Sequence, residues 1–527
     1  MPEIKYALIS VYDKKGIAEL ASNLEIAGYT LIATGNTYKF LKSEGIANLK
    51  KIDEITGFPE ILGGRVKTLH PVIFGGILSI RNNESHGDDL IKNEINLIDF
   101  VIVNLYPFKE MAGKNIADDE KLEFIDIGGV SLLRAAAKNY KDVAVVINPS
   151  FYEDIISYLK NKQEIPERVK KLYAYETFKL TAEYDAAIAG FLNPDNAGKV
   201  GNKELGPGIG LSLKKTFSLR YGENPHQKAA FYRTDKADGS LPFEKLSGKD
   251  ISYNNLLDID SALGIIKDFN NGLTKNYFAT IVKHTNPCGA ALSGKSLKDA
   301  FLSARKTDEI SSYGGIIGFN KKLDEETASE IKPFFVEIIL APEYSEESLK
   351  ILGAKKNTIL IKYNEGFISD NSGILSFKSS CGGFLVQEKD DFADDRSLFK
   401  TVTGVKMEQS VLCDLIFAWK IAKHVKSNAI VYAKNGATKG IGAGQMSRID
   451  AAVFAFEKMK NAFGEIKEFV MASDGFFPFR DSVEYAAKIG VCGIIQPGGS
   501  IRDDEVIEAA NKLNVPMIFT GIRHFKH

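Results

Sequence analysis

The chain has 527 residues, more than one hydrophobic core usually supports, so we expect two or three domains. Its hydrophobic content of 44% and its charged content of 26% are ordinary for a globular protein. The formal net charge of -1 provides no overall field that would draw the chain to nucleic acid or to a membrane. No apolar run approaches membrane-spanning length.

Strand and helix patterns alternate over the first part of the chain. Such alternation is typical of a parallel sheet with helices on both faces, so the sequence predicts an α/β domain. The predicted strands are 4–11, 29–33, 100–105 and 143–147, and the predicted helices are 16–27, 37–43 and 166–190.

Two segments that follow predicted strands have the chemistry of a phosphate site. Ser10 begins the first, SVYDKKG, and Thr34-Gly35-Asn36-Thr37 is the second. Hydroxyl groups and the free N–H groups of a helix N-terminus bind phosphate. Serine and threonine at such places are also ordinary helix N-caps, but two such segments on neighbouring strands favour the phosphate interpretation.

Basic groups recur further along. Arg65 and Lys67 would point the same way if their segment is extended, although a solvated basic loop fits the same pattern. A Gly-Gly turn after Asp126 leads into a helical composition that ends near Lys138. A surface position is the usual fate of a lysine, so Lys138 alone indicates nothing.

A polar, glycine-rich stretch interrupts the pattern between residues 193 and 210. We therefore expect a first domain over 1–195, a linker over 196–210 and a second region over 211–527.

The most informative segment of the second region is Lys283-His284-Thr285-Asn286-Pro287-Cys288-Gly289. It follows the apolar run 278–282, a predicted buried strand, and the pairs Asn286-Pro287 and Cys288-Gly289 predict the turn that ends it. A histidine moves protons near neutral pH, and an adjacent ammonium stabilises developing negative charge. The pair suits carbonyl-group transfer, and the alternative is a basic pair on the surface.

The stretch 429–436, followed by 440–445, has the same design of an apolar strand that ends in a basic residue, an asparagine and a glycine. This similarity suggests a duplicated α/β unit.

Four cysteines, Cys288, Cys381, Cys413 and Cys492, are scattered without metal-ligand spacing, and no CxxC pair occurs. Sparse cysteine is typical of a reducing cytoplasm. The first residues, Met-Pro-Glu-Ile-Lys, lack the apolar core of a signal peptide, so we expect a cytoplasmic protein.

Ten segments together carry a resemblance. They are SVYDKKG, GGRVKTLHP, NLYPF, DIGGVSLLRAAAKN, RYGENPHQ, KHTNPCG, AKNG, GIGAGQMSR, DGFFPFRD and RHFKH, in this order from end to end. On these segments the chain resembles the bifunctional purine-biosynthesis family that is both AICAR transformylase and IMP cyclohydrolase. The resemblance implies formyl transfer from 10-formyltetrahydrofolate to the 5-amino group of AICAR, followed by dehydration and closure of formyl-AICAR to IMP.

The resemblance also implies a fold. The N-terminal domain should be a methylglyoxal-synthase-like parallel sheet, and the C-terminal region should contain two cytidine-deaminase-like α/β units. The PCxxC zinc signature of the deaminases is absent, so the resemblance implies no catalytic metal. It further implies a homodimer with transformylase sites at the subunit interface, and no nucleic-acid or membrane partner.

The resemblance assigns the cyclohydrolase site to residues before the linker. Lys138 matches the acid–base lysine of the family, and Asp126 completes the pocket with it. Asn36 departs from the glycine often found in its loop, but asparagine tolerates left-handed backbone. The substrate-binding residues implied are Ser10, Tyr12, Asp13, Lys14, Thr34, Gly35, Asn36, Thr37, Arg65, Lys67, Thr68, Asn104, Leu105, Tyr106 and Ile127.

The transformylase residues follow the linker. Lys283 and His284 match the catalytic pair, and Glu337 replaces an aspartate found in some relatives. Phe476 suits a flat pterin, although aromatic residues mostly fill cores. The implied AICAR contacts are Arg220, Tyr221, Gly314, Glu337, Asn428 and Arg448, and the implied folate contacts are Ile449, Phe476, Asp481, Ser500, Ile501 and Arg523.

The chemistry fits these residue types. His284 can accept the proton of the weakly nucleophilic AICAR amine, while Lys283 stabilises the formyl oxygen as it becomes negative. Ring closure joins two groups of one molecule, so orientation supplies much of its rate.

Two other classes of function would fit parts of the sequence. A methylglyoxal-synthase-like lyase or a regulatory nucleotide-binding module would explain the first domain, but not the second. A nucleic-acid-binding protein would need a recognisable module and a basic surface, and the sequence supplies neither.

Overall fold

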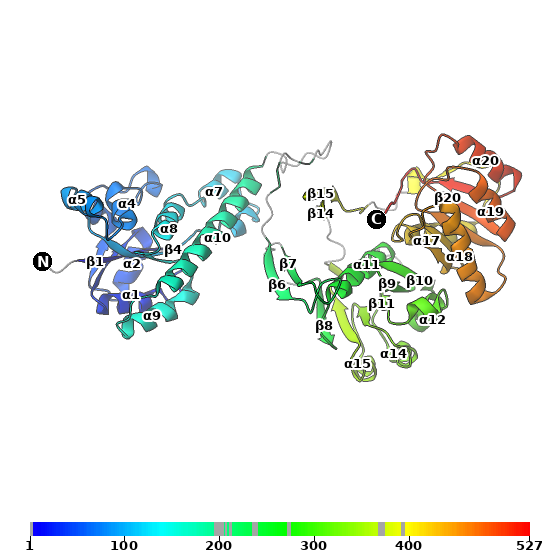
Figure 1. Cartoon of the computed structure of the whole chain (residues 1–527), viewed down its shortest axis with the longest axis horizontal. Coiled ribbons are helices and arrows are strands. Elements are labelled where there is room, and N and C mark those ends of the chain that lie inside the picture. The colour runs from blue at the N-terminus through cyan, green and yellow to red at the C-terminus, as the bar shows by residue number, and fades with distance from the viewer. Residues whose placement is uncertain are drawn as a thin grey trace. The chain divides into compact units, whose positions relative to one another are not determined.

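The computed structural model describes residues 4–193, 205, 208–209, 213–233, 241–270, 276–366, 375–391 and 396–527. The chain divides into two compact units, Met1–Leu213 with Thr234–Ala237, and Lys214–Arg233 with Asp238–His527 (Figure 1). Most of the predicted linker, 196–210, lies outside the described residues. Within the described ranges, no helix is both long and apolar enough to cross a membrane.

The first unit is built on a five-stranded parallel sheet with the order β3-β2-β1-β4-β5. The strands are β1 (Lys5–Val11), β2 (Tyr29–Ala33), β3 (Leu49–Lys51), β4 (Ile98–Asn104) and β5 (Ala144–Val146). The apolar runs of β1, β2, β4 and β5 are largely buried, as expected for parallel strands with helices on both faces. The predicted parallel sheet is therefore confirmed.

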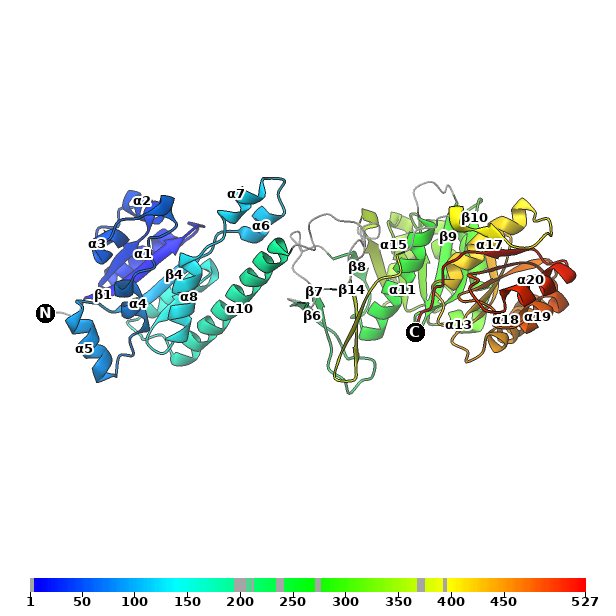
Figure 2. The same cartoon turned by 90° about the horizontal axis from the view of Figure 1, so that it is seen from above.

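The helices of the first unit fall into two groups. Right-handed crossovers place the β1–β2 and β2–β3 helices on one face and the β4–β5 helix on the other. On one face α1 (Ile17–Ile26) packs against α9 (Tyr152–Lys160), beside α2 (Gly35–Ser43). On the other face, α8 (Gly128–Lys138) packs between α4 (Pro71–Leu78) and α10 (Glu167–Leu192). Figure 2 shows α10 beside α8. Smaller helices are α3 (Ile52–Thr56), η1 (Leu62–Gly64), α5 (Glu84–Lys92), α6 (Phe108–Ala112), α7 (Asp118–Leu122) and η2 (Pro149–Phe151).

The second unit contains one twelve-stranded sheet, made of two five-stranded repeats and one further strand at each end. The first repeat is α11 (Tyr253–Phe269), β9 (Tyr277–Lys283), β10 (Asn286–Ser293), α12 (Leu297–Arg305), β11 (Ile316–Phe319), α14 (Glu325–Ile331), β12 (Ile338–Ala341), α15 (Glu346–Gly353) and β13 (Ile359–Tyr363). The second is α17 (Gln409–Ala422), β17 (Ile430–Lys434), β18 (Ala437–Gly442), α18 (Arg448–Phe463), β19 (Phe469–Ser473), α19 (Asp481–Ile489), β20 (Val491–Gln496), α20 (Asp503–Lys512) and β21 (Met517–Phe519).

The two repeats are equivalent in detail, which confirms the predicted duplication. In each, an antiparallel hairpin is followed by three strands parallel to one another. The backbone N–H of Phe278 donates to Asn320 Oδ1 at 2.7 Å, and at the equivalent place Ala429 donates to Asp474 Oδ1 at 3.1 Å. The repeats meet where β10 pairs antiparallel with β18, so a half-turn relates them.

The remaining strands lie outside the repeats. β8 (Phe243–Ser247) and β16 (Lys400–Thr401) pair antiparallel with β13 and β21 at the two ends of the sheet. Two separate ribbons pair β6 (Lys214–Ser218) with β7 (Ala230–Arg233) and β14 (Leu375–Ser380) with β15 (Gly383–Glu388). Short α13 (Glu309–Ser312) and η4 (Arg396–Leu398) complete the described elements.

The cores of the second unit differ between the faces of the sheet. On one face α11 and α17 share a single core that runs across both repeats. On the opposite face α12, α14 and α15 form one core, and α18, α19 and α20 form another. The repeats are therefore joined through one continuous apolar layer.

The pairing pattern brings one set of strand ends to a common edge of the sheet. β9 ends there at Lys283, and β11 and β12 begin there because they run opposite to β9. β17 also begins at this edge, while β19, β20 and β21 end there. We call it the Lys283 edge.

The turn after β9 differs from the sequence prediction. His284 and Thr285 form it, with φ of +53° and +63°. Asn286, Pro287 and Cys288 already belong to β10, where Asn286 pairs with Lys283. The prediction of a turn at 286–289 was wrong, because a two-residue turn formed without glycine or proline.

Candidate functional site

The predicted phosphate segments of the first unit meet at the carboxyl ends of β1 and β2. Ser10 Oγ lies 3.0 Å from Thr34 Oγ1. Thr37 Oγ1 accepts from the Val11 N–H at 3.2 Å and lies 3.1 Å from the Val11 carbonyl. Because the chain order reverses at β1, which lies between β2 and β4, this edge is where open α/β sheets bind ligands.

The hydroxyl groups here are not used as helix caps. The N-terminus of α2 begins after Thr34, whose side chain makes no capping hydrogen bond, and α1 begins after Gly16 rather than Ser10. The first N–H groups of α2 therefore donate no hydrogen bond to the Thr34 side chain, which leaves them available to an anion. Asn36 lies within α2, and the residue of this segment with positive φ is Gly35, at +28°. Asn36 therefore does not need to adopt a left-handed backbone conformation.

Lys14 reaches into the same place. Its Nζ donates to the Val11 carbonyl and to Thr37 Oγ1 at 3.3 Å. Burial lowers the pKa of Lys14, and the charge of Asp13 partly opposes this effect.

The loop after β1 is fixed by Asn104 at the end of β4. Asn104 Oδ1 accepts from the N–H groups of Tyr12 at 2.5 Å and Asp13 at 3.0 Å, and its Nδ2 donates to the Asp13 carbonyl at 2.9 Å. The Tyr12 and Tyr106 rings meet edge to face at 5.5 Å. Tyr12 and Tyr106 are exposed, as is Ile127, and Leu105 is partly buried, so an apolar surface borders the polar segments and suits a flat base.

Asp126 provides a carboxyl group beside this surface. It accepts from the Gly129 N–H at 2.6 Å at the start of α8, while its own N–H donates to Tyr184 Oη at 2.8 Å. Burial raises the pKa of Asp126, and the Gly129 hydrogen bond and the charge of Lys67 oppose the rise. A carboxyl group with a raised pKa is a candidate for proton transfer.

Thr68 and the two glycines of α8 complete this corner. The Thr68 hydroxyl is buried and has no hydrogen-bond partner in the described part of the chain. A Cβ on Gly128 would lie 2.5 Å from that hydroxyl, and one on Gly129 would lie 2.4 Å from an Asp126 oxygen. A larger residue at either position would displace one of these oxygens, and the unpaired hydroxyl faces the first turn of α8.

Two predicted residues do not join this group. Arg65 is exposed, adopts helical φ and ψ rather than an extended conformation, and forms an ion pair with Glu123. Lys138 is the exposed last residue of α8, whereas Asp126 precedes its first. The length of α8 separates them by about 15 Å, and the neighbouring Asn139 bonds the carbonyls of Ile77 and Ser79, far from the carboxyl ends of the strands.

In the second unit, the predicted site residues that lie in or next to strands of the large sheet are all at the Lys283 edge. Lys283 Nζ donates to the Tyr313 carbonyl at 2.8 Å, which leaves two further donors on the ammonium. His284 is exposed in the turn. Both line a cavity of about 460 Å³ together with Cys288, Asp308, Phe454 and Lys458.

Of the first group of candidate AICAR contacts, Gly314 lies beside this pair, since it directly follows Tyr313, whose carbonyl Lys283 bonds. Gly314, at φ +72°, donates to the Phe335 carbonyl at 2.9 Å just before β11. Glu337 directly precedes β12 and pairs with Lys249 at 2.6 Å. Arg220 lies over the ring of its neighbour Tyr221 at 4.7 Å in the loop after β6.

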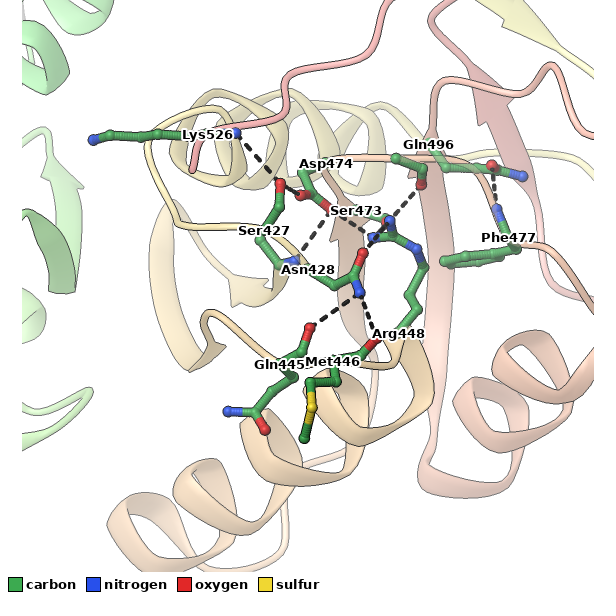
Figure 3. A network of polar contacts seen from close by, with 12 residues as sticks. Ser427, Asn428, Gln445, Met446, Arg448, Ser473, Asp474, Phe477, Gln496 and Lys526 are labelled. Carbon is green, nitrogen blue, oxygen red and sulfur yellow. Dashed lines mark hydrogen bonds and ion pairs between the residues drawn. The ribbon is translucent and has the colours of Figure 1, made fainter. Parts of the chain in front are cut away.

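The second group surrounds a buried ion pair (Figure 3). Arg448, 8% exposed, donates through Nη1 to Asp474 Oδ1 at 2.5 Å and Ser473 Oγ at 2.7 Å, and through Nη2 to Asn428 Oδ1 at 3.0 Å. Asp474, 1% exposed, also accepts from Ser427 Oγ. These bonds fix the planar guanidinium and the Asn428 amide at the start of β17.

The candidate folate contacts other than Ile449 lie in the segments that follow β19, β20 and β21. Phe476 is half-buried, whereas its neighbour Phe477 is fully buried in the core. Ser500 donates its N–H to Asp503 at 3.1 Å, and Ile501 beside it is fully exposed. Asp481 begins α19 and is exposed, Ile449 is half-buried in α18, and the exposed Arg523 lies over the Phe525 ring at 4.3 Å.

These two groups stand apart along the Lys283 edge. Glu337 precedes β12, and Arg448 bonds residues at the end of β19, with β11, β9, β10, β18 and β17 between the two strands. Six steps between neighbouring strands correspond to about 29 Å. Glu337 and Arg448 therefore lie too far apart for one nucleotide to contact both in one chain.

Sequence reasoning missed two acidic residues at this edge. Asp474 directly follows the buried strand β19, and an acidic residue at such a place is a signal that could have been read. Asp258, on α11, accepts from the Thr285 N–H at 2.6 Å, and no local pattern indicates it. Over the described ranges, no group of three or more His, Cys, Asp or Glu side chains could hold a metal ion.

The fold and the two residue groups define a two-unit α/β enzyme with an anion-binding sheet edge in one unit and a basic, cavity-lining pair in the other. Comparison with known proteins agrees. Residues 16–131 match the MGS-like domain family, and residues 136–458 match the AICARFT/IMPCHase bienzyme family.

Curated relatives match along the whole chain. Proteins described as "Bifunctional purine biosynthesis protein PurH" from Petrotoga mobilis and from Thermoanaerobacter sp. are each 46% identical, and one from Aquifex aeolicus is 45% identical. Each match covers 99% of this chain and 100% of the relative. The chain therefore belongs to the AICARFT/IMPCHase bienzyme family.

The chain is accordingly a bifunctional enzyme of purine biosynthesis, an AICAR formyltransferase and an IMP cyclohydrolase, and formyl transfer to AICAR involves a folate cosubstrate. The predicted family, fold class and function are confirmed. A lyase or a regulatory module resembling methylglyoxal synthase does not describe this chain, because the bienzyme match extends through the second unit.

Proposed function

We propose that the first unit, over about residues 1–195, closes formyl-AICAR to IMP, and that the second, from about residue 211, transfers the formyl group from 10-formyltetrahydrofolate to AICAR. The observation that carries this division is that each unit contains its own sheet edge with candidate residues. The anion-binding segments lie in one unit and the Lys283–His284 pair in the other.

In the cyclohydrolase, the phosphate of formyl-AICAR binds Ser10, Thr34, Thr37, Lys14 and the N-terminus of α2. An uncapped helix N-terminus and the adjacent hydroxyl groups of Ser10 and Thr34 support this role. The base then lies against Tyr12, Tyr106, Leu105 and Ile127, and Asp13, Asn104, Gly35 and Asn36 shape the loops around it.

Asp126 transfers protons during ring closure, with Lys67 and Thr68 beside it. The carboxyl group is buried with a raised pKa, and the unpaired Thr68 hydroxyl is available to a substrate atom. Arg65 is assigned to this pocket by resemblance alone, since it is exposed and pairs with Glu123. Lys138 is the acid–base lysine by resemblance, but the length of α8 prevents it from acting on the same atoms as Asp126 within one chain.

Separate variants distinguish these assignments. Asp126→Asn should lower the kcat of cyclisation about 100- to 10,000-fold, while formyl transfer continues and formyl-AICAR accumulates. Lys138→Ala should do the same only if Lys138 reaches the site in the assembled enzyme. Normal IMP formation by Asp126→Asn would refute the assignment of Asp126.

In the transformylase, His284 accepts the proton from the AICAR amine as it attacks the formyl carbon. Lys283 stabilises the oxygen that becomes negative, since two of its ammonium donors remain available. Arg220, Tyr221, Gly314, Glu337, Asn428 and Arg448 bind AICAR, and Ile449, Phe476, Asp481, Ser500, Ile501 and Arg523 bind the folate.

Loss of the pair should act on one reaction only. His284→Ala should nearly abolish formyl transfer while cyclisation of supplied formyl-AICAR continues, and Lys283→Ala should cost about 100- to 1,000-fold. If the pair acts on one transition state, the double variant should lose less than the product of the two effects. Wild-type formyl transfer by His284→Ala would refute the assignment.

The active assembly is a homodimer in which two copies contribute to each transformylase site. Support comes from the distance of about 29 Å between Glu337 and the Arg448 group, since both are candidate contacts of one AICAR molecule. Mixing inactive His284→Ala and Arg448→Met chains tests this sharing. Partial recovery of formyl transfer is expected, and no recovery in confirmed mixed dimers would contradict it.

The enzyme works in the cytoplasm. Its four cysteines are unpaired, which suits a reducing compartment. Fractionation of cells that produce the chain tests this location, and recovery in a secreted fraction would contradict it.

A further inference from the structure

The hairpins that open the two repeats of the second unit have the same turn but different sequences. His284 and Thr285 connect β9 to β10 with φ of +53° and +63°, and Asn435 and Gly436 connect β17 to β18 with φ of +55° and +67°. Positive φ at both positions is the type I′ geometry of two-residue hairpins, for which Asn-Gly is a preferred sequence. His-Thr is not, because a β-branched residue rarely adopts positive φ.

Each turn is held by an aspartate from the helix that precedes the hairpin. Asp414, on α17, accepts from the N–H groups of Asn435 and Gly436, both at 2.7 Å. Asp258, at the equivalent place on α11, accepts from the Thr285 N–H at 2.6 Å and also from the N–H of His284. The lysines before the turns are equivalent too, since Lys283 and Lys434 each donate to a backbone carbonyl at 2.8 Å.

The turn depends on the aspartate carboxylate to a different degree in the two repeats. Asn435-Gly436 adopts the turn by its own preference, so Asp414 adds hydrogen bonds to a conformation that is already favoured. His284-Thr285 adopts it against its preference, so its conformation depends on contacts from outside the hairpin. Asp258 is one such contact. The Thr285 carbonyl makes two others, since it accepts from Ser261 Oγ at 3.0 Å and lies 3.3 Å from Lys526 Nζ.

We propose that Asp258 is a positioning residue for formyl transfer, because its carboxylate holds the His284–Thr285 turn in the left-handed conformation that presents Lys283 and His284. The inference rests on the proposed function of that pair. Asp258 itself contacts backbone N–H groups and does not need to contact substrate.

The duplication provides a matched control. Asp258→Ala should lower the kcat of formyl transfer about 100-fold, the usual cost of a catalytic group displaced by about 1 Å, with little change in KM for AICAR or in cyclisation. Asp414→Ala removes the same two hydrogen bonds from the equivalent turn and should leave kcat unchanged. Similar melting temperatures for the two variants would show that folding does not explain the difference.

A second substitution tests the mechanism. Thr285→Gly in the Asp258→Ala chain should restore most of the lost kcat, because glycine adopts positive φ without help. Asp258→Asn keeps one acceptor oxygen, so it should lose less kcat than Asp258→Ala and should respond to Thr285→Gly in the same direction.

The outcomes separate this inference from the proposed function. Equal losses of kcat in Asp258→Ala and Asp414→Ala, or no restoration by Thr285→Gly when that substitution alone is active, would overturn the positioning role. Wild-type formyl transfer by His284→Ala, measured in the same series, would instead overturn the proposed function of the pair.

Discussion

The buried ion pair between Arg448 and Asp474 allows a quantitative prediction. Arg448→Met removes the cation but leaves the Asp474 carboxylate, 1% exposed, with only the Ser427 hydroxyl and the Ala429 N–H. An uncompensated buried charge of this kind costs about 3–5 kcal/mol. The free energy of unfolding of the second unit should fall by that amount.

The first repeat indicates how the loss can be recovered. Asn320 occupies the place of Asp474 there, and its neutral amide accepts from the Phe278 N–H at 2.7 Å. Adding Asp474→Asn to Arg448→Met should therefore bring the free energy of unfolding to within about 2 kcal/mol of the wild type, because no buried charge remains.

The single tryptophan of the chain supplies the assay. Trp419 is buried in α17, 4.8 Å from the His524 ring, and the His524 N–H donates to the Asp474 carbonyl at 3.0 Å. Its fluorescence in urea reports unfolding of the second unit alone. As a control, Lys322→Met removes one partner of an exposed ion pair with Glu343 and should cost less than about 1 kcal/mol. An Arg448→Met loss as small as that of the control, or no recovery on adding Asp474→Asn, would refute the reasoning.

Other predictions concern the division of the chain, acid and thiols. A fragment that ends at residue 195 should fold and cyclise formyl-AICAR, and a folded fragment without that activity would contradict the proposed division. Burial opposes ionisation of Asp268, but bonds and charges from His424 and Lys423 outweigh it and lower the pKa to about 2. Its stabilising effect should therefore be present above about pH 4 and lost as pH falls to about 2, so Asp268→Asn should destabilise the second unit at pH 7 and not at pH 2. Burial raises the pKa of Cys288 to about 12, so exposed Cys381 and Cys413 should react with a thiol reagent at pH 8 well before Cys288.

The parallel sheet of the first unit could be predicted because its strands are buried on both faces and appear as continuous apolar runs. The eight-residue helix α4, with the sequence PVIFGGIL, received no prediction. It contains two glycines and three β-branched residues, and its helical form comes from burial of Ile73 and Ile77 against the sheet.

The place of a site residue at a sheet edge could be predicted where it follows from the strand next to that residue in the sequence. Ser10, Thr34 and His284 each follow an apolar strand, so the sequence indicated their place at a sheet edge. The turn at His284 was misplaced because its conformation depends on Asp258, a residue on another element. Lys138 was grouped with Asp126 by the resemblance alone, and the sequence does not show that a helix carries Lys138 away from Asp126, toward the opposite edge of the sheet.

The antiparallel pairing of β10 with β18 has a consequence for the history of the second unit. A half-turn exchanges the two edges of the sheet, so the Lys283 edge joins the hairpin end of one repeat to the strand-terminal end of the other. Two identical, unfused repeats paired in this way would present two identical edges. Fusion into one chain allows each edge to change separately, so one edge can be specialised for a reaction while its counterpart, where Asn435 stands in the place of His284, is released from it.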